Sequence, residues 1–163
     1  MVIGGFLTGM YVASRYEARL GFVARETHRL REDLRREQAT LRERATLYES
    51  LDELLRDPST RVVSLRGTGP NAAAQGRVVW LDTVGGHLFV TKLAPAPEGK
   101  AYEVWTIAQG VPRAAGLFQV GASGEAVAKI QSVADSVEAF AVSLEPSAGV
   151  TAPSGPFVLA SPR

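Results

Sequence analysis

The sequence predicts a mainly β protein: an antiparallel β-sandwich of about eight strands, preceded by a long α-helix with coiled-coil character and by part of a transmembrane helix. Three observations predict this order. Residues 1–14 are apolar and uncharged, residues 15–57 are dense in charge with a seven-residue apolar repeat, and residues 58–163 alternate short apolar runs with turn residues. We therefore expect the C-terminal part of a transmembrane helix, a coiled-coil stalk and a β-sandwich domain, in that order.

The first part, MVIGGFLTGMYVAS, contains no charged side chain. As a helix it would be roughly 21 Å long, which is short of the ~30 Å hydrocarbon core of a bilayer. It lacks the basic start of a secretory signal, and its glycines Gly4, Gly5 and Gly9 are typical of membrane helices. We interpret it as the end of a membrane span. The alternative is a flexible apolar tail or a cap on the folded domain.

The second part repeats its apolar residues in the alternating steps of three and four that are typical of a coiled coil. Thr27, Glu37 and Arg44 interrupt the repeat. Two interpretations stay open: a parallel homodimer through this helix, or an amphipathic helix that folds back onto its own domain. The seam residues are Leu20, Val23, Leu30, Leu34, Leu41, Tyr48, Leu51 and Leu55.

Charge density separates the second part from the third. Residues 15–57 contain ten arginines and ten acidic residues, whereas residues 58–163 contain eight basic and seven acidic residues. Proline disfavours the helical conformation in the residue before it, so Asp57-Pro58 is expected to end the helix and to mark the boundary. The arginines are interleaved with acids and the net charge is only +1, which argues against nucleic acid as a partner.

Beyond Pro58 the apolar periodicity falls to two, and turns rich in glycine and proline recur. Eight short strands with such regular turns are typical of an antiparallel sandwich or barrel. The candidate strands are 61–65, 74–82, 88–93, 101–108, 115–120, 126–130, 139–144 and 157–160.

Residues that could carry catalysis or bind a metal are few. The chain has no cysteine, which excludes disulfides and thiolate chemistry. His28 lies at an outward position of the helix and His87 follows Gly85-Gly86 in an expected hairpin turn, so we expect two exposed histidines and no shared zinc site. The nucleophile motif Gly-x-Ser-x-Gly does not occur. We expect no enzyme activity, no catalytic residue, no cofactor and no metal.

Aromatic and acidic residues of the third part have a structural interpretation. Trp80, Tyr102 and Trp105 are expected in the core of the sandwich rather than in a ligand site. Glu145 ends an apolar strand, and a buried carboxylate without partners would be costly. We therefore expect it to be exposed or to accept hydrogen bonds from loop amides, in which case it ties down the loop of residues 147–156.

Several separated motifs of the third part occur together in a familiar order. The runs 102–105, 116–118, 140–146 and 153–156 resemble the C-terminal domain of the anti-sigma-K factor (RskA-like) family, over about residues 57–163. We expect the motif positions to define the fold rather than to bind a ligand. They are Trp80, Tyr102, Val104, Trp105, Gly116, Phe118, Leu144, Glu145, Pro146, Gly149, Pro153 and Gly155.

The resemblance implies a single-span bacterial membrane protein. In that family a cytoplasmic N-terminal domain holds a sigma factor inactive, the C-terminal domain lies outside the membrane, and regulated proteolysis of the span releases the sigma factor. This sequence departs from the pattern because the sigma-binding domain, often with a His and Cys zinc motif, is absent from it. We expect the extracytoplasmic regulatory and sensory part of a membrane-bound anti-sigma factor that controls transcription, with residues 15–163 outside the bacterial cell membrane.

The expected partners follow from this interpretation. They are the membrane, a second copy of the chain through the helix, and site-1-type and intramembrane proteases; a sigma factor would be bound only through the absent domain. The alternative function is a membrane-tethered coiled-coil spacer or assembly module of the envelope without a signalling role. A third, a small sandwich enzyme or sugar binder, needs a concave site with convergent carboxylates.

Overall fold

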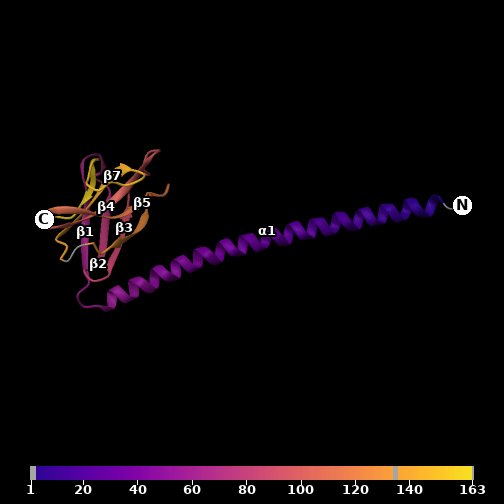
Figure 1. Ribbon diagram of the computed structural model, residues 1–163, viewed down its shortest axis with the longest axis horizontal. Helices are drawn as coiled ribbons and strands as arrows, with labels where there is room; N and C mark the ends of the chain where they lie inside the picture. The colour runs from indigo at the N-terminus through magenta and orange to yellow at the C-terminus, as the bar shows by residue number, and fades with distance from the viewer. Residues whose placement is uncertain (1–2, 134–135, 163) are drawn as a thin grey trace. The chain divides into compact units, whose positions relative to one another are not determined.

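The computed structural model describes residues 3–133 and 136–162, with side chains from residue 26 onward. It divides into two units, residues 1–49 and residues 50–163. The first unit holds most of helix α1 (Ile3–Arg56), and the second holds the last turns of α1 together with eight β-strands (Figure 1). The division into three domains that the sequence suggests stays a prediction.

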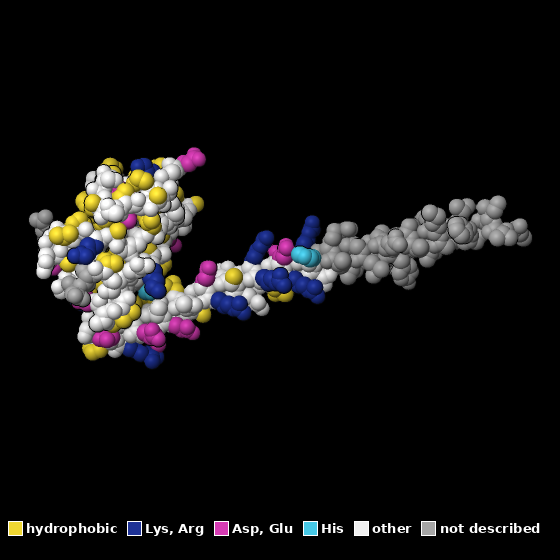
Figure 2. Space-filling model, in the orientation of Figure 1, with side chains coloured by type: hydrophobic (Ala, Val, Ile, Leu, Met, Phe, Trp, Pro, Cys, Tyr) yellow, Lys and Arg dark blue, Asp and Glu magenta, His cyan; other side chains and the backbone are white. Residues whose placement is uncertain are grey.

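Helix α1 is a single helix of 54 residues, and the prediction of a long helix is confirmed. Between residues 26 and 49 its side chains are exposed except for half-buried Leu47, and basic and acidic groups are interspersed along it (Figure 2). Asp52 and Arg56 form an i,i+4 ion pair with an N–O distance of 2.7 Å. Such exposed pairs stabilise a helix by only about 0.2–0.5 kcal/mol, so this pair adds little to the stability of α1.

Most of the described seam residues of α1 are exposed in the single chain, although Leu51 is half-buried. Leu30, Leu34, Leu41 and Tyr48 are each more than half exposed, while the side chains of Leu20 and Val23 lie outside the described residues. The coiled coil therefore stays a prediction.

The expected membrane segment, residues 1–14, also concerns side chains outside the described part of the chain. Within the residues that the structure describes, no helix combines the length and the apolar character that crossing a bilayer requires.

Helix α1 ends at Arg56, directly before Asp57-Pro58, as the sequence predicts. The Asp57 amide donates to the Leu54 carbonyl oxygen at 3.2 Å, and the Asp57 carboxylate accepts a hydrogen bond from the Ser59 amide at 2.8 Å. These two hydrogen bonds satisfy polar groups at the end of the helix, where the intrahelical hydrogen bonds stop. The chain then turns and enters the first strand.

The described residues of the second unit form eight strands and a short 3-10 helix, η1 (Gly69–Asn71). Every strand overlaps one of the eight predicted from the sequence, although β3 begins at Gly85 and β5 at Val111, earlier than expected. The strands are β1 (Arg61–Gly67), β2 (Gln75–Leu81), β3 (Gly85–Thr91), β4 (Lys100–Ala108), β5 (Val111–Phe118), β6 (Ala126–Gln131), β7 (Ala139–Pro146) and β8 (Phe157–Ala160).

The strands are ordered β5-β4-β7-β8-β1-β2-β3-β6, and all their pairings are antiparallel. The prediction of about eight antiparallel strands is confirmed, but the two separate sheets of a sandwich are replaced by one sheet, because β8 pairs with both β7 and β1. The two edges approach each other: a Cβ atom on Gly116 of β5 would lie 2.8 Å from the carbonyl oxygen of Lys129 on β6. The sheet is thus a nearly closed barrel, which leaves little edge unprotected.

Inward-facing side chains of alternate strand positions fill the barrel. Trp80 packs edge-on against Phe140 with ring centroids 5.2 Å apart, and Tyr102 contacts Phe118 at 5.6 Å. Trp80 and Tyr102 are core residues, as expected. Trp105 is also buried, but it belongs to the opposite face of β4, outside the central cluster. That opposite face is where the motif residues gather.

Candidate functional site

Strands β4 and β7 lie side by side and bury polar side chains on their outer face. Glu103 on β4 is directly opposite Ser143 on β7, while Trp105 is opposite Ala141 and Glu145 is opposite Ala101. Because side chains alternate between the two faces of a strand, these positions share one face. Glu103, Trp105, Ser143 and Glu145 are all at most 4% exposed. The polar cluster is covered by the loop of residues 147–156, which we call the clamp loop.

Glu145 binds the clamp loop through its carboxylate. The Ser154 amide donates to Oε1 at 3.0 Å, the Ser154 hydroxyl donates to Oε2 at 2.5 Å, and the Gly155 amide donates to both oxygens at 3.0 Å. On the strand side, the Ser143 hydroxyl donates to Oε1 at 2.5 Å and accepts a hydrogen bond from the Trp105 indole at 2.8 Å. The carboxylate is therefore fully buried and fully satisfied, the second of the two environments that the sequence left open.

Two opposing effects act on the pKa of Glu145. Burial by itself raises this pKa, but the hydrogen bonds from Ser143, Ser154 and Gly155 outweigh it and lower the pKa to about 2. Hydrogen bonds donated to a carboxylate stabilise its ionised form. Glu145 is thus an anion at neutral pH that holds the clamp loop by charge-assisted hydrogen bonds.

Glu103 is the second carboxylate of the cluster, and its pKa moves in the other direction. Burial raises the pKa of Glu103, the hydrogen bond from the Val150 amide (3.0 Å to Oε2) lowers it, and the negative charge of Glu145 raises it further. Two carboxylates with separated pKa values can serve as an acid and a base. Here both carboxylates accept hydrogen bonds from amides of the clamp loop, and Glu145 also accepts them from the hydroxyls of Ser143 and Ser154, so the arrangement fits a clamp rather than a catalytic pair. Among the described residues there is also no group of three or more His, Cys, Asp or Glu that could hold a metal ion.

Two glycines allow the clamp loop to lie against the strands. A Cβ atom on Gly155 would lie 1.9 Å from the Leu144 carbonyl oxygen, so only glycine fits at this position. Gly149 has a positive φ of 75°, and a Cβ atom there would lie 2.9 Å from Leu117 Cδ1 and 3.2 Å from Glu103 Oε1. The loop is also bound through the backbone, since the Leu144 amide donates to the Pro156 carbonyl oxygen at 3.1 Å.

Replacing Gly149 by alanine is expected to lower the free energy of unfolding by about 1–2 kcal/mol, because the left-handed backbone is strained for alanine and the added methyl group crowds Leu117. The matched control is Gly99→Ala, since Gly99 has a similar φ of 73° but nothing within 4 Å of the added atom. Urea unfolding of both variants measures the difference. Equal losses of unfolding free energy in the two variants would show that the contact between the added methyl group and Leu117 does not destabilise the fold.

The structure separates the predicted motif residues into two groups. Trp105, Glu145, Pro146, Gly149, Pro153 and Gly155 belong to the polar cluster, to the strand end beside it or to the clamp loop. Leu144 is half-buried and packs against the barrel core instead. Tyr102, Val104 and Phe118 line the barrel interior with Trp80, and Gly116 lies where the sheet edges approach.

Sequence reasoning missed Ser143 and Ser154, which are the hydroxyl donors to Glu145. A signal for Ser143 was available, since Ser-x-Glu at alternate strand positions places both side chains on one face.

The last turns of α1 contact the outer face of β2 and β3 within the same unit. Leu54 is buried against Val79, Leu81 and Phe89 on the outer face of β2 and β3. Beside this apolar contact, the hydroxyl of Ser50 and Nε2 of His87 form a hydrogen bond of 2.9 Å. The end of the helix is therefore attached to the barrel by one apolar and one polar contact.

The prediction that His87 is exposed in a hairpin turn is wrong. His87 lies within β3 and is only 7% exposed, because β3 begins at Gly85 and the end of α1 covers this face. Burial lowers the pKa of His87, and the positive charge of Lys129, directly opposite on β6, lowers it further. His28, by contrast, is exposed on α1 as expected.

The lowered pKa of His87 predicts that acid weakens the fold. A base whose pKa is lower in the folded state than its ordinary 6.5 binds protons more readily when unfolded, so stability is fully present above pH 6.5 and falls as the pH approaches the folded-state value. Urea unfolding at pH 7.5 and at pH 5.5 is expected to show a smaller loss for His87→Gln than for the natural chain. His28→Gln is the control, and an identical pH dependence in all three chains would contradict this assignment.

The chain is similar to a known protein family and to a bacterial relative. The model of the family "Anti-sigma-K factor rskA, C-terminal" matches residues 8–157. A relative from Streptomyces griseus, named "Uncharacterized protein in phr 5'region", is 31% identical over 119 residues, which cover 72% of this chain and 48% of the relative. The chain thus spans about half the length of that relative. No solved structure matches the chain.

Proposed function

Because the chain belongs to the family of the C-terminal region of anti-sigma-K factor RskA, we propose that it is the regulatory, non-enzymatic part of a membrane-bound anti-sigma factor. In this proposal the barrel senses a condition outside the membrane, and its state controls the activity of a sigma factor and hence transcription. The proposal extends to the whole protein, of which the barrel is the sensory part.

One observation carries the proposal that the barrel communicates with the helix. The last turns of α1 are packed into the barrel unit through Leu54 and through the hydrogen bond between Ser50 and His87. The helix is continuous from Ile3 to Arg56, so a change that releases its end from the barrel acts on the same element that leads toward the N-terminus. This continuity supports a role in which α1 transmits a change in the barrel toward the N-terminus, rather than a role as a spacer alone.

The proposed topology follows the three parts of the sequence. Residues 1–14 would be the C-terminal part of a transmembrane helix, residues 15–57 a stalk, and residues 58–163 an extracytoplasmic domain of a bacterial membrane protein. Site-1-type and intramembrane proteases would act next to the membrane, and a sigma factor would be bound through a domain other than residues 1–163. The exposed heptad residues of α1 support a homodimer through the stalk.

The proposal is tested in the bacterium that carries the gene. A chromosomal Leu54→Asp variant places a charge in the apolar contact between α1 and the barrel, and sequencing of total RNA is expected to show a coordinated change in a set of genes that share one promoter type. The matched control is Val111→Asp, because Val111 is 53% exposed on β5 and lies outside both the apolar contact and the heptad seam. An unchanged transcript profile in the Leu54→Asp strain would favour the envelope spacer instead.

A further inference from the structure

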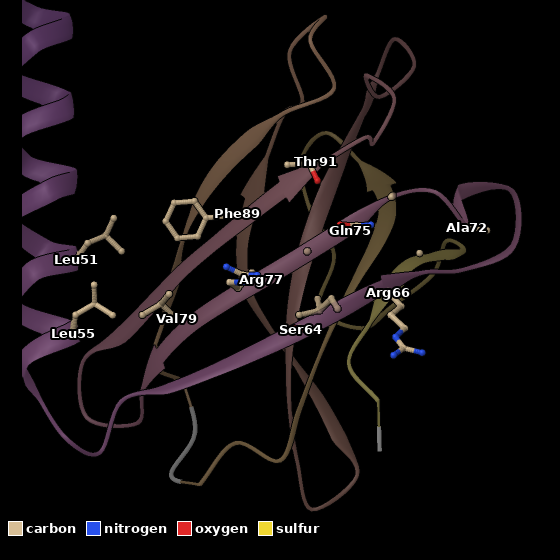
Figure 3. A pocket seen from close by; sticks show the side chains of 14 residues that line it. Leu51, Leu55, Ser64, Arg66, Ala72, Gln75, Arg77, Val79, Phe89 and Thr91 are labelled. Carbon is tan, nitrogen blue, oxygen red and sulfur yellow. The ribbon is translucent and has the colours of Figure 1, made fainter.

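A groove of about 960 Å³ lies on the outer face of the barrel, between the last turns of α1 and strands β1, β2 and β3 (Figure 3). Its volume is in the range of small-molecule sites, which is about 300–1,000 Å³. The groove is separate from the clamp loop, since none of its lining residues belongs to β4, β7 or the loop of residues 147–156.

One half of the groove is basic. Arg66 on β1 and Arg77 on β2 are diagonal neighbours on the same face, because Arg66 pairs with Gln75 and Ser64 pairs with Arg77. Both arginines are exposed, and neither forms an ion pair with any carboxylate in the described part of the chain. Among the residues that the structure describes, no acidic side chain lines the groove, while Ser64, Gln75 and Thr91 add hydrogen-bonding groups.

The other half of the groove is apolar. Leu51 and Leu55 of α1 face Val79 and Phe89 of the sheet, and Arg77 lies between this apolar side and the polar side (Figure 3). Arg77 is directly opposite Phe89 in the strand register, so charge and apolar surface adjoin within one cross-strand pair. Leu55 is 64% exposed despite its position beside this surface.

We infer that the groove binds a small amphipathic anion, with a carboxylate or phosphate head against Arg77 and an aliphatic body between Leu51, Leu55 and Phe89, while Arg66 adds positive charge at the polar end of the groove. Arginine binds planar oxyanions through paired hydrogen bonds, and the absence of competing carboxylates in the lining leaves both guanidinium groups available. A ligand in this position touches α1 and the sheet at once, so it holds the end of the helix on the barrel. The site depends only on these side chains, whatever the chain regulates.

Calorimetric titration at low ionic strength and pH 7.5 tests the site with three probes below their micelle concentrations. Decanoate carries both the head and the body, acetate carries only the head, and decylammonium carries the same body with the opposite charge. The natural chain is expected to bind decanoate and to bind acetate and decylammonium much more weakly. Arg77→Gln is expected to weaken decanoate binding about tenfold or more, because a hydrogen bond to a charged group is lost.

The matched control is Arg113→Gln, which removes an exposed arginine on β5, outside the groove, and should leave decanoate binding unchanged. Amide NMR shifts caused by decanoate should be largest at residues 51–55, 77 and 89. Circular dichroism verifies that each variant is folded. The inference is overturned if no probe binds the folded natural chain, if Arg77→Gln binds decanoate as tightly as the natural chain, or if decylammonium matches decanoate, which would indicate a merely apolar surface.

Discussion

Replacing Glu145 by glutamine is expected to lower the free energy of unfolding at pH 7 by about 2–4 kcal/mol, because the substitution removes a charge that buried donors share and adds an amide donor among them. The Ser154 amide, the Gly155 amide and the hydroxyls of Ser143 and Ser154 all donate to this carboxylate. Urea unfolding monitored by tryptophan fluorescence measures the loss, and hydrogen exchange should show faster exchange at the amides of Ser154 and Gly155.

Glu103→Gln is the matched control on the same face of the neighbouring strand. Glutamine can still accept the hydrogen bond from the Val150 amide, and the substitution removes a buried charge whose pKa is raised by burial and by Glu145. We therefore expect Glu103→Gln to be neutral within about 0.5 kcal/mol or stabilising at pH 7. Similar losses for the two variants would contradict the assignment of opposite roles to the two carboxylates.

Acid titration distinguishes the two carboxylates as well. The pKa of Glu145 is about 2 in the folded state against an ordinary 4.5, so its contribution to stability is present above pH 4.5 and is lost as the pH falls toward 2. The pKa of Glu103 is raised, so its ionisation reduces stability as the pH rises through the folded-state value. The Glu145→Gln chain should therefore lose less stability than the natural chain between pH 5 and pH 3.

Substituting both Leu34 and Leu41 by aspartate is expected to convert a dimer into a monomer of 17.4 kDa. Each residue is 56% exposed in the single chain and occupies the same heptad position, so in a parallel dimer the four new carboxylates would lie together in the seam. Analytical ultracentrifugation measures the mass. Ala39→Asp with Thr46→Asp is the control, because these residues lie on the opposite side of the heptad and add the same charge.

Two outcomes would contradict a dimer that forms through this seam. If the natural chain and the Leu34, Leu41 variant have the same mass, the seam does not mediate self-association. If the control variant dissociates as well, added charge rather than position is responsible. In either case the exposed leucines of α1 would need another partner.

The sequence predicted the helix and the strands better than the closing of the strands into one barrel-like sheet. The period of two and the recurring turns located all eight strands, and Asp57-Pro58 located the end of α1, because both are local signals. A barrel and a sandwich use the same alternating pattern, and the pairing of β8 with both β7 and β1 that distinguishes them here is a long-range property. Trp105 shows the same limit: its burial was predicted, but the face on which it is buried depends on where the clamp loop lies.

The candidate site was predictable in part. Glu145 before Pro146 indicated a carboxylate at a strand end, and its need for donors suggested the loop that follows. The role of Ser154 was hidden, because it depends on the path of a loop eight residues beyond the strand. His87 was assigned to a turn because glycines precede it, yet Gly85 and Gly86 are strand residues in which close packing excludes a Cβ atom: such an atom on Gly86 would lie 2.0 Å from the Val79 carbonyl oxygen.

If the state of the barrel controls protease access to the helix, as we propose, the rate of cleavage between residues 15 and 21 in membranes depends on the barrel. The natural chain, the Leu54→Asp variant and a chain that ends at residue 57 are compared, with cleavage sites located by mass spectrometry. We predict slow cleavage of the natural chain and cleavage that is several-fold faster when the contact between α1 and the barrel is broken or the barrel is removed. Equal cleavage rates in all three chains would show that the barrel does not control access to the helix.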